Sequence, residues 1–208
     1  MTEGIFITIE GPNGAGKSTL MELVAERLRV LDFRVLETVE PSRSSLGDLV
    51  RRLERVHGGK TYACLIAADR YHHLESEIEP AIASGSIVIS ARYFESSLVL
   101  QGLDGVSAEF IWAINSAIRV PDLSIVLTAD PDILEKRTAA RPARSRFEGL
   151  HSRAVELNAY LEAADVIASK GFNVLRLENG IVSIEENADA VCAAVLRLIH
   201  RDNQHAHP

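Results

Sequence analysis

The chain has 208 residues, of which 47% are apolar, and its formal net charge is −7 at neutral pH. This length and composition suffice for one hydrophobic core, so we expect a single domain spanning residues 1–208. The acidic balance disfavours binding to nucleic acid or to an anionic membrane, because both are themselves negatively charged.

The first half of the chain alternates short apolar runs with helical patterns. Residues 5–9 form a β-branched run that predicts a strand, and residues 17–31 place leucine and valine at helical spacing. A second strand is expected at 34–38, followed by helices at 46–56 and 62–84.

The second half of the chain continues the same alternation. Strands are expected at 87–90, 123–128 and 172–177, and helices at 96–100, 107–118, from Asp130 onward, 148–169 and 184–199. Five strands separated by helices predict a three-layer α/β fold, with a five-stranded parallel sheet and helices on both faces. The polar tail, at about 202–208, is expected to be disordered.

No segment of the sequence has the composition of a targeting or membrane-spanning element. The N-terminus has no basic region, and its apolar stretch is only as long as a strand, which is not typical of a signal peptide. No run approaches the roughly 18 apolar residues that a membrane span needs. We therefore expect a cytoplasmic protein without a membrane partner.

A glycine-rich motif directly follows the first expected strand. Residues 11–18, GPNGAGKS, match the pattern G-x-x-x-x-G-K-[ST] and lie between an expected strand and an expected helix. Such glycines allow backbone N–H groups to converge on phosphate oxygens, and the helix N-terminus adds a positive dipole end. This P-loop predicts a P-loop NTPase fold. The residues expected to bind ATP are Gly11, Pro12, Asn13, Gly14, Ala15, Gly16, Lys17, Ser18 and Thr19.

Within the P-loop, two side chains have distinct expected roles. Lys17 should reach the β- and γ-phosphates and act in catalysis, and the Ser18 hydroxyl should bind the Mg²⁺ that accompanies ATP. A chance glycine turn would not place strand, helix and Lys-Ser pair in register.

An arginine-rich segment at about 140–148 is expected to form a mobile lid. It contains Arg141, Arg144 and Arg146, and Arg137 lies one helical turn before Arg141. A kinase needs such a cover to exclude water and to bring cations to the transferring phosphoryl group. The alternative is an ordinary solvated loop.

A second set of cations lies in the middle of the chain. Arg92 directly follows an expected strand, at the edge of the sheet where doubly wound folds bind ligands, and Arg51 and Arg70 lie on expected helices. Ser97 and Gln101 are four residues apart on one helix face and could bind the edge of a base. Surface arginines are common on helices, so Arg51 and Arg70 could instead be ordinary solvated residues.

Several longer segments together resemble the thymidylate kinase family, over about residues 5–160. They are IEGPNGAGKST, EPSRSSLGDLVR, AADRYHHLESEIEPAI, ARYFESSLVLQG, VPDLSIVL and RFE. The resemblance implies ATP-dependent phosphorylation of dTMP to dTDP, a requirement for Mg²⁺, and a homodimer.

The resemblance also implies roles for individual residues. Arg70, Ser97 and Gln101 match residues that bind the thymine edge, and Arg51 and Arg92 match arginines that hold the acceptor phosphate. Arg92 is also expected to act in catalysis. Arg141 and Arg146 match the catalytic lid arginines of the bacterial type. The full set expected to bind the acceptor is Glu40, Arg51, Ile66, Arg70, Arg92, Ser97 and Gln101.

The sequence departs from the family pattern at five positions. Ala91 stands where the family has an aspartate near Mg²⁺ and the acceptor phosphate, and Val39 stands in place of an arginine. Ile66 and Leu100 replace aromatic residues of the base and sugar site, and Ser145 replaces an acidic lid residue. Two alternatives therefore stay open: a kinase for a modified or other pyrimidine nucleotide, and a weakly catalytic nucleotide-binding sensor or partner protein. Glu10 and Glu40 are candidates to replace the missing acid, or are structural.

Overall fold

The computed structural model describes residues 4–140, 142 and 145–205. Its five strands form one parallel sheet, and each runs for five or six residues: β1 Ile5–Glu10, β2 Val35–Val39, β3 Ile87–Ala91, β4 Leu123–Thr128 and β5 Val174–Glu178. The order across the sheet is β2-β3-β1-β4-β5. The predicted three-layer α/β fold with a five-stranded parallel sheet is confirmed.

The helices connect these strands in chain order. They are α1 Lys17–Val30, α2 Ser45–Leu53, α3 Gly59–His73, α4 Glu79–Ala83, α5 Phe94–Leu103, α6 Ala108–Ile114, α7 Pro131–Ala139, α8 Arg153–Ser169 and α9 Ile184–His205. A π-helical turn, Leu74–Ile78, joins α3 to α4, and a 3₁₀ turn, Arg146–Gly149, precedes α8. No described helix is long and apolar enough to cross a membrane.

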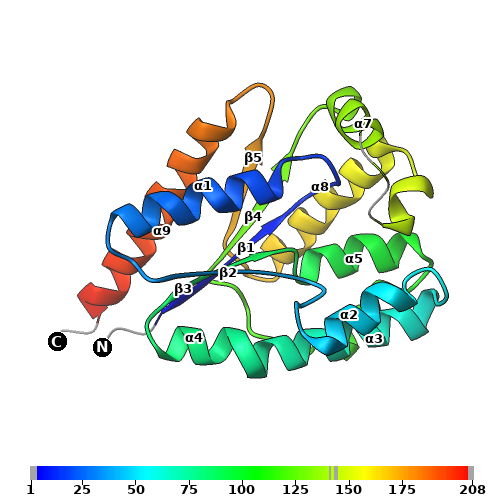
Figure 1. Cartoon of the computed structure of the whole chain (residues 1–208), viewed down its shortest axis with the longest axis horizontal. Coiled ribbons are helices and arrows are strands. Elements are labelled where there is room, and N and C mark those ends of the chain that lie inside the picture. Colours follow the sequence, from blue (N-terminus) through cyan, green and yellow to red (C-terminus); the bar gives the residue numbers. More distant parts are fainter. Residues whose placement is uncertain (1–3, 141, 143–144, 206–208) are drawn as a thin grey trace.

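The two faces of the sheet bury different sets of side chains, because successive residues of a strand point to opposite sides. On one face Ile7, Ile9, Ile89 and Ala91 belong to a core cluster that also contains buried residues of α1 and α9. On the other face, Phe6 packs with residues of α3, α5 and α6. Figure 1 shows α1 and α9 on one side of the sheet, with α4 and α5 on the other.

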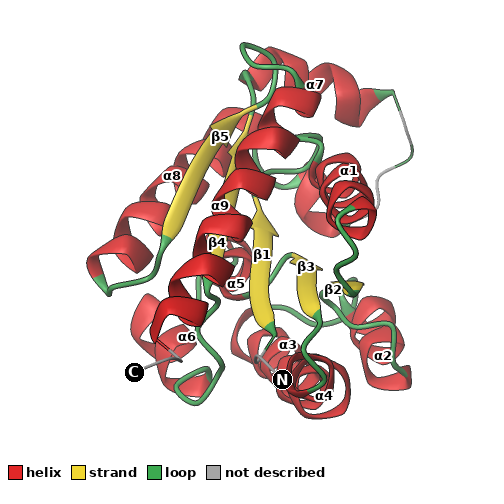
Figure 2. Cartoon of the chain, turned by 90° about the vertical axis from the view of Figure 1, so that its left-hand side faces the viewer, coloured by secondary structure: helices red, strands yellow, loops and turns green. Residues whose placement is uncertain are grey.

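The topology brings the functional segments to one edge of the sheet. The chain passes from β1 to β2 and β3 on one side and then to β4 and β5 on the other. In parallel sheets ligands bind beyond the carboxyl ends of strands, where the winding direction reverses. Helices α2 and α3 contact one another beside this sheet, whereas α7 lies at the opposite end of the molecule from α4 (Figures 1 and 2).

Two of the predicted helices have boundaries that differ from the sequence prediction for local reasons. The helix predicted at 62–84 begins at Gly59 and changes to π geometry before Pro80, a residue that has no N–H to donate. The helix predicted at 148–169 begins only at Arg153, because the Ser152 side chain caps it by accepting a bond from the Val155 N–H.

The C-terminus also differs from the prediction. A disordered tail was expected from about residue 202, but α9 continues through His205, and residues 206–208 lie outside the described part. The apolar spacing on which the prediction rested ends earlier than the helix, because a helix can extend beyond its buried face through backbone hydrogen bonding alone.

Candidate active site

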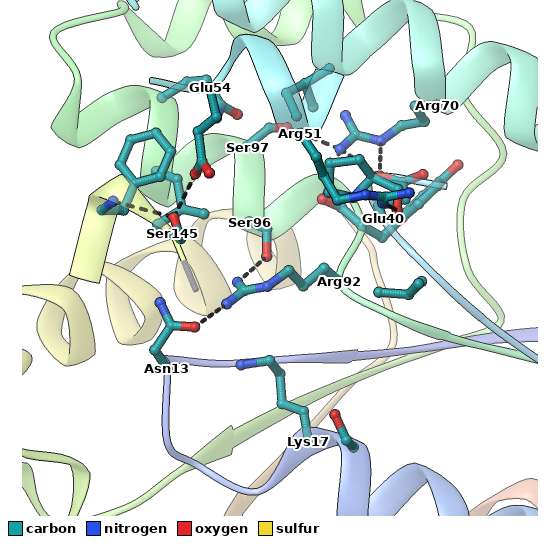
Figure 3. Close-up of a pocket in the computed structure, with 18 of the residues that line it drawn as sticks. Asn13, Lys17, Glu40, Arg51, Glu54, Arg70, Arg92, Ser96, Ser97 and Ser145 are labelled. Carbon is teal, nitrogen blue, oxygen red and sulfur yellow. Dashed lines mark hydrogen bonds and ion pairs between the residues drawn. The ribbon is translucent and has the colours of Figure 1, made fainter. Parts of the chain in front are cut away.

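One cavity of about 660 Å³ runs along the carboxyl edge of the sheet, from the P-loop to α2, α3 and α5. Its P-loop side includes Asn13, Gly14, Gly16, Lys17, Ser18 and Thr19. Its other side includes Glu40, Arg51, Glu54, Tyr62, Ile66, Arg70, Ser97, Leu100 and Gln101. Arg92 lies between the two sides (Figure 3). The cavity thus brings most of the predicted binding residues together.

The P-loop has the backbone geometry that a phosphate cradle requires. Gly16 caps α1 with φ 103°, and Gly11 has φ 138°, values that L side chains rarely adopt. A Cβ on Gly11 would meet the Leu127 carbonyl oxygen at 2.0 Å. The Lys17 amine donates to the carbonyl oxygens of Gly11 at 2.8 Å and Pro12 at 2.9 Å. The exposed side chains of Ser18 and Thr19 lie at the N-terminus of α1, where the helix dipole favours anions.

Buried polar side chains from distant segments hold the P-loop in place. The Asn13 backbone N–H donates to Glu156 Oε1 at 3.1 Å, and Glu156 is ion-paired with Arg153 one turn earlier on α8. On the opposite side, the Asn179 amide donates to the Ala15 carbonyl at 2.6 Å. These three supports could not be predicted from the sequence, because nothing local marks Glu156 or Asn179 as the partner of a loop more than 140 positions away.

Arg92 connects the P-loop to α5 and α8. It follows β3 with φ 75°, an uncommon conformation for a residue other than glycine. Its guanidinium donates to Asn13 Oδ1 at 2.7 Å, to Ser96 Oγ at 3.1 Å and to the Tyr160 hydroxyl at 2.8 Å. Figure 3 shows it between Asn13 and Lys17 on one side and Ser96 on the other. A single cation therefore faces both ends of the cavity.

The turn that carries Arg92 is fixed by Glu10 at the end of β1. One oxygen of Glu10 accepts from the Tyr93 backbone N–H at 2.5 Å, and the other accepts from Ser96 Oγ at 2.5 Å. A second buried carboxyl, Glu95, lies nearby: burial raises its pKa to about 8, and the charge of Glu10 adds to the shift. Glu95 is therefore mostly protonated at neutral pH, which avoids two negative charges in the same buried region.

Arg70 is held tightly at the inner end of the cavity. It is 1% exposed and donates to Glu40, Asn115 Oδ1, the Tyr93 carbonyl and Ser97 Oγ at 2.6–2.9 Å. A guanidinium has five N–H donors, so four bonds to described residues leave one for a ligand. The predicted neighbourhood of Arg70 and Ser97 is present, and most of the arginine's donors serve to position it.

Gln101 offers the clearest sign of a ligand-binding group. Its side chain is 2% exposed and lines the cavity, and its Oε1 has no hydrogen-bond partner among the described residues. Because a buried polar atom without a partner is costly, it usually meets water or a ligand. Arg51 also lines the cavity, and its guanidinium donates to the carbonyl oxygens of Pro41 and Ser42.

Two aromatic residues that the sequence analysis did not single out form part of the cavity wall. Tyr62 and Phe147 are buried, their ring centroids are 6.3 Å apart, and both line the cavity. Ile66 and Leu100, which stand where family aromatics were expected, pack against this pair. The available signal was the position of Tyr62, one helical turn before Ile66 on the same face of α3.

The lid residues have different placements. Arg141 and Arg144 lie outside the described residues. Arg137 lines the cavity and donates to the Gly14 carbonyl at 3.2 Å. Arg146 is instead ion-paired with Asp104 at 2.6 Å and is not among the described residues that line the cavity. Its catalytic role, and the lid itself, stay predictions.

Ala91 and Val39, two of the positions that depart from the family pattern, lie side by side at the carboxyl ends of β3 and β2. Ala91 of β3 lies opposite Val39 of β2 and Ile9 of β1, and its carbonyl accepts from the Glu40 N–H at 3.1 Å. Ala91 is 5% exposed and belongs to the core cluster beneath α1. The side chain at this position therefore points to the face of the sheet that carries the P-loop helix.

The sequence of this chain is similar to those of several known proteins. A family model described as thymidylate kinase matches residues 9–186. A probable thymidylate kinase of Pyrobaculum aerophilum is 38% identical over 200 residues, covering 94% of this chain and 96% of that protein. One of Pyrococcus abyssi is 36% identical over 202 residues, covering 92% and 96%. The thymidylate kinase of Pseudomonas fluorescens is 33% identical over 208 residues, covering 94% and 98%.

Proposed function

The chain belongs to the thymidylate kinase family and is a phosphotransferase, and we propose that its cavity binds ATP at the P-loop and dTMP between α3 and α5. A phosphate oxygen of dTMP attacks the γ-phosphorus of ATP, and the bond to the β,γ-bridging oxygen breaks. The products are dTDP and ADP.

The contacts of Arg92 carry this proposal. Its guanidinium touches Asn13 of the P-loop and Ser96 of α5, so its charge lies between the expected donor and acceptor phosphates. Phosphoryl transfer depends mainly on positioning and on stabilising charge on the transferring group. Lys17 and the N-terminus of α1 act on the ATP side, and Ser97 and Gln101 are suited to the base.

The residues of the site fit a magnesium ion that is bound together with ATP. Mg²⁺ keeps several waters and needs few protein ligands where phosphates supply oxygens. The Ser18 hydroxyl, exposed and lining the cavity, is suited to be its protein ligand, and the described residues hold no cluster of three potential metal-binding side chains. When bound, the ion neutralises phosphate charge.

The acceptor should be recognised by its base edge. We expect dTMP to be the best common acceptor, dUMP to be weaker, and purine monophosphates to be poor. A base with the wrong edge leaves the buried Oε1 of Gln101 unpaired, which weakens the binding of that nucleotide relative to dTMP. The measurement is coupled ADP release with each monophosphate at fixed ATP and Mg²⁺.

The same panel tests the two alternatives. Ile66 and Leu100 line the cavity without an aromatic ring, which favours some tolerance of a modified pyrimidine. A modified pyrimidine monophosphate that turned over faster than dTMP would replace dTMP as the acceptor. Faster ADP release with AMP or GMP than with dTMP would contradict the proposal. ATP binding without turnover of any acceptor would favour the alternative of a weakly catalytic nucleotide-binding sensor.

Ala91 gives a prediction about rate. Both acids that were candidates to replace the missing aspartate already accept hydrogen bonds from protein groups. Glu10 accepts from Tyr93 and Ser96, and Glu40 accepts from Arg70. We therefore expect Ala91→Asp to raise kcat roughly tenfold, which corresponds to about 1.4 kcal/mol of barrier, by ordering water and the acceptor phosphate. The measurement is steady-state kinetics at saturating ATP and Mg²⁺.

Ala91→Asn is the matched control, because it has nearly the same volume without the charge. Burying either polar group beneath α1 should lower thermal stability, so both variants are compared by their Tm as well. An Ala91→Asp enzyme whose kcat equalled that of Ala91→Asn, or fell below the wild type, would show that the aspartate is not needed here.

The family resemblance also suggests a homodimer, which stays a proposal. Light scattering after size-exclusion chromatography would measure the mass against the 22.7 kDa of one chain.

A further inference from the structure

Asp104 connects three segments that are far apart in the sequence. It caps the C-terminus of α5, the helix that carries Ser96, Ser97 and Gln101. Its two carboxylate oxygens accept from the Arg146 guanidinium at 3.0 and 2.6 Å, and one of them also accepts from the Gly59 backbone N–H at 2.6 Å. Both partners of this bidentate pair are partly buried, with side chains 21% and 14% exposed. Such charge-assisted, two-bond pairs fix geometry as well as adding energy.

The Arg146 side chain, fixed in this way, lies against two aromatic rings. Its guanidinium carbon is 4.3 Å from the centroid of the Phe147 ring and 5.6 Å from that of Tyr62. A cation within about 6 Å of a ring centroid is attracted by the ring's quadrupole. Because both rings line the cavity on the acceptor side and pack with Val50, Ile66 and Leu100, the arginine supports the cavity wall from behind.

The hydrogen bonds of Asp104 favour its ionised form. Burial by itself raises the pKa of this carboxyl, but the hydrogen bonds from Arg146 and from the Gly59 N–H outweigh burial and hold the pKa below its usual value. The carboxylate therefore stays ionised at neutral pH. A neutral side chain at position 104 would weaken the hold on Arg146, because the pair would lose its charge.

We propose that Asp104 is a positioning residue for acceptor binding, which acts by holding Arg146 against Tyr62 and Phe147 and so fixing the aromatic wall of the acceptor site. This inference rests on the proposed function. It assigns Arg146 to the wall rather than to the transferring phosphoryl group, and it explains how rings next to the aliphatic Ile66 and Leu100 can offer a rigid surface to a base. A second contact, Ser145 Oγ to Glu54 at 2.5 Å, attaches the same segment to the end of α2.

The test is the kinetic effect of Asp104→Asn. This substitution keeps an acceptor for the Gly59 N–H and removes the charge. We expect the KM for dTMP to rise roughly tenfold, equivalent to about 1.4 kcal/mol, with kcat within twofold of the wild type and the KM for ATP unchanged. Asp165→Asn is the matched control, because it breaks an Arg–Asp pair with Arg176 on the exposed surface. It should leave all three parameters unchanged.

A double-mutant cycle with Arg146→Ala separates the two roles of Arg146. If Arg146 acts through Asp104, the double variant should have a KM for dTMP no higher than the worse single variant. Asp104→Glu, which keeps the charge, should recover part of the loss. Should Asp104→Asn fail to fold, judged by circular dichroism, Arg146→Lys provides the same test, since an ammonium cannot make the bidentate pair.

Three outcomes would overturn the inference. The first is an Asp104→Asn enzyme with an unchanged KM for dTMP. The second is an Arg146→Ala enzyme that loses kcat at constant KM, which would place Arg146 on the transferring group. The third is a wild type without dTMP-dependent ADP release, which would overturn the proposed function together with this inference. An active wild type with an unaffected Asp104→Asn variant would overturn the inference alone.

Discussion

Replacing Lys17 with alanine should lower the kcat for dTMP phosphorylation by about a thousandfold or more, equivalent to roughly 4 kcal/mol of transition-state stabilisation. The amine lies at the mouth of the P-loop, against the carbonyl oxygens of Gly11 and Pro12, and lines the cavity. On the ATP side it is the side-chain cation that the loop itself contributes. Its loss removes this charge from beside the carbonyl oxygens of Gly11 and Pro12.

The fold should tolerate this substitution, because Lys17 is only partly buried and begins a helix that is anchored through Leu20, Val24 and Leu28. Single-turnover and steady-state kinetics give the loss of rate, and thermal unfolding gives the stability. Lys170→Ala, at an exposed lysine after α8, is the control for a removed lysine charge. A folded Lys17→Ala protein with near-normal turnover would refute the P-loop kinase assignment.

Replacing Arg92 with methionine should have the next largest effect, lowering kcat/KM for dTMP by roughly a hundredfold to a thousandfold. Methionine keeps much of the apolar stem and removes the guanidinium. Asn13, Ser96 and Tyr160 then lose their shared partner, and the cation between the two phosphate sites is lost with it. Because Asn13 belongs to the P-loop, the KM for ATP should also rise, though by less than the KM for dTMP.

Arg92→Lys distinguishes charge from shape. A lysine restores the positive charge but cannot reach Asn13 and Tyr160 at once as the planar guanidinium does, so its rate should fall between those of wild type and Arg92→Met. Arg176→Met, at an exposed arginine, is the control. Since unpaired buried partners cost about 1–3 kcal/mol each, Tm is measured for every variant. If Arg92→Met kept wild-type kcat/KM while remaining folded, the site between the phosphates would have to be assigned to another residue.

For Arg92, the position in the fold could be predicted from the sequence, but most of its contacts could not. Its place after the third strand could be predicted, since the alternation of short apolar runs and helical patterns is a local property. The carboxyl edge of the sheet follows from topology rules, so the arginine was expected near a ligand. Two of its three partners could not be predicted, because Asn13 and Tyr160 lie 79 and 68 positions away. Only the packing of the P-loop, the end of β3 and α8 beside one another brings them into contact.

The lid segment shows the opposite case, in which composition suggested one role and packing another. Arginines near a P-loop predict contacts with phosphate, and nothing local to Arg146 indicates otherwise. The fold places Asp104, at the end of α5, and the ring of Tyr62 within reach of its guanidinium. A charge in a partly buried site binds the nearest opposite charge with suitable geometry, and that neighbour is decided by how α3, α5 and the turn at Arg146–Gly149 pack together.

The sequence by itself determined the P-loop, the parallel α/β fold and the family, because these depend on residue spacing along one short stretch or on a repeated local pattern. The tertiary structure alone decided which polar groups stay available for a ligand. Arg70 and Gln101 look alike as candidates in the sequence, yet Arg70 has most of its donors bound to Glu40, Asn115, Tyr93 and Ser97, whereas Gln101 keeps a buried oxygen that no described residue contacts by a hydrogen bond. The physical reason is that hydrogen-bond capacity is shared among all groups within about 3 Å, and those neighbours come from separate parts of the chain.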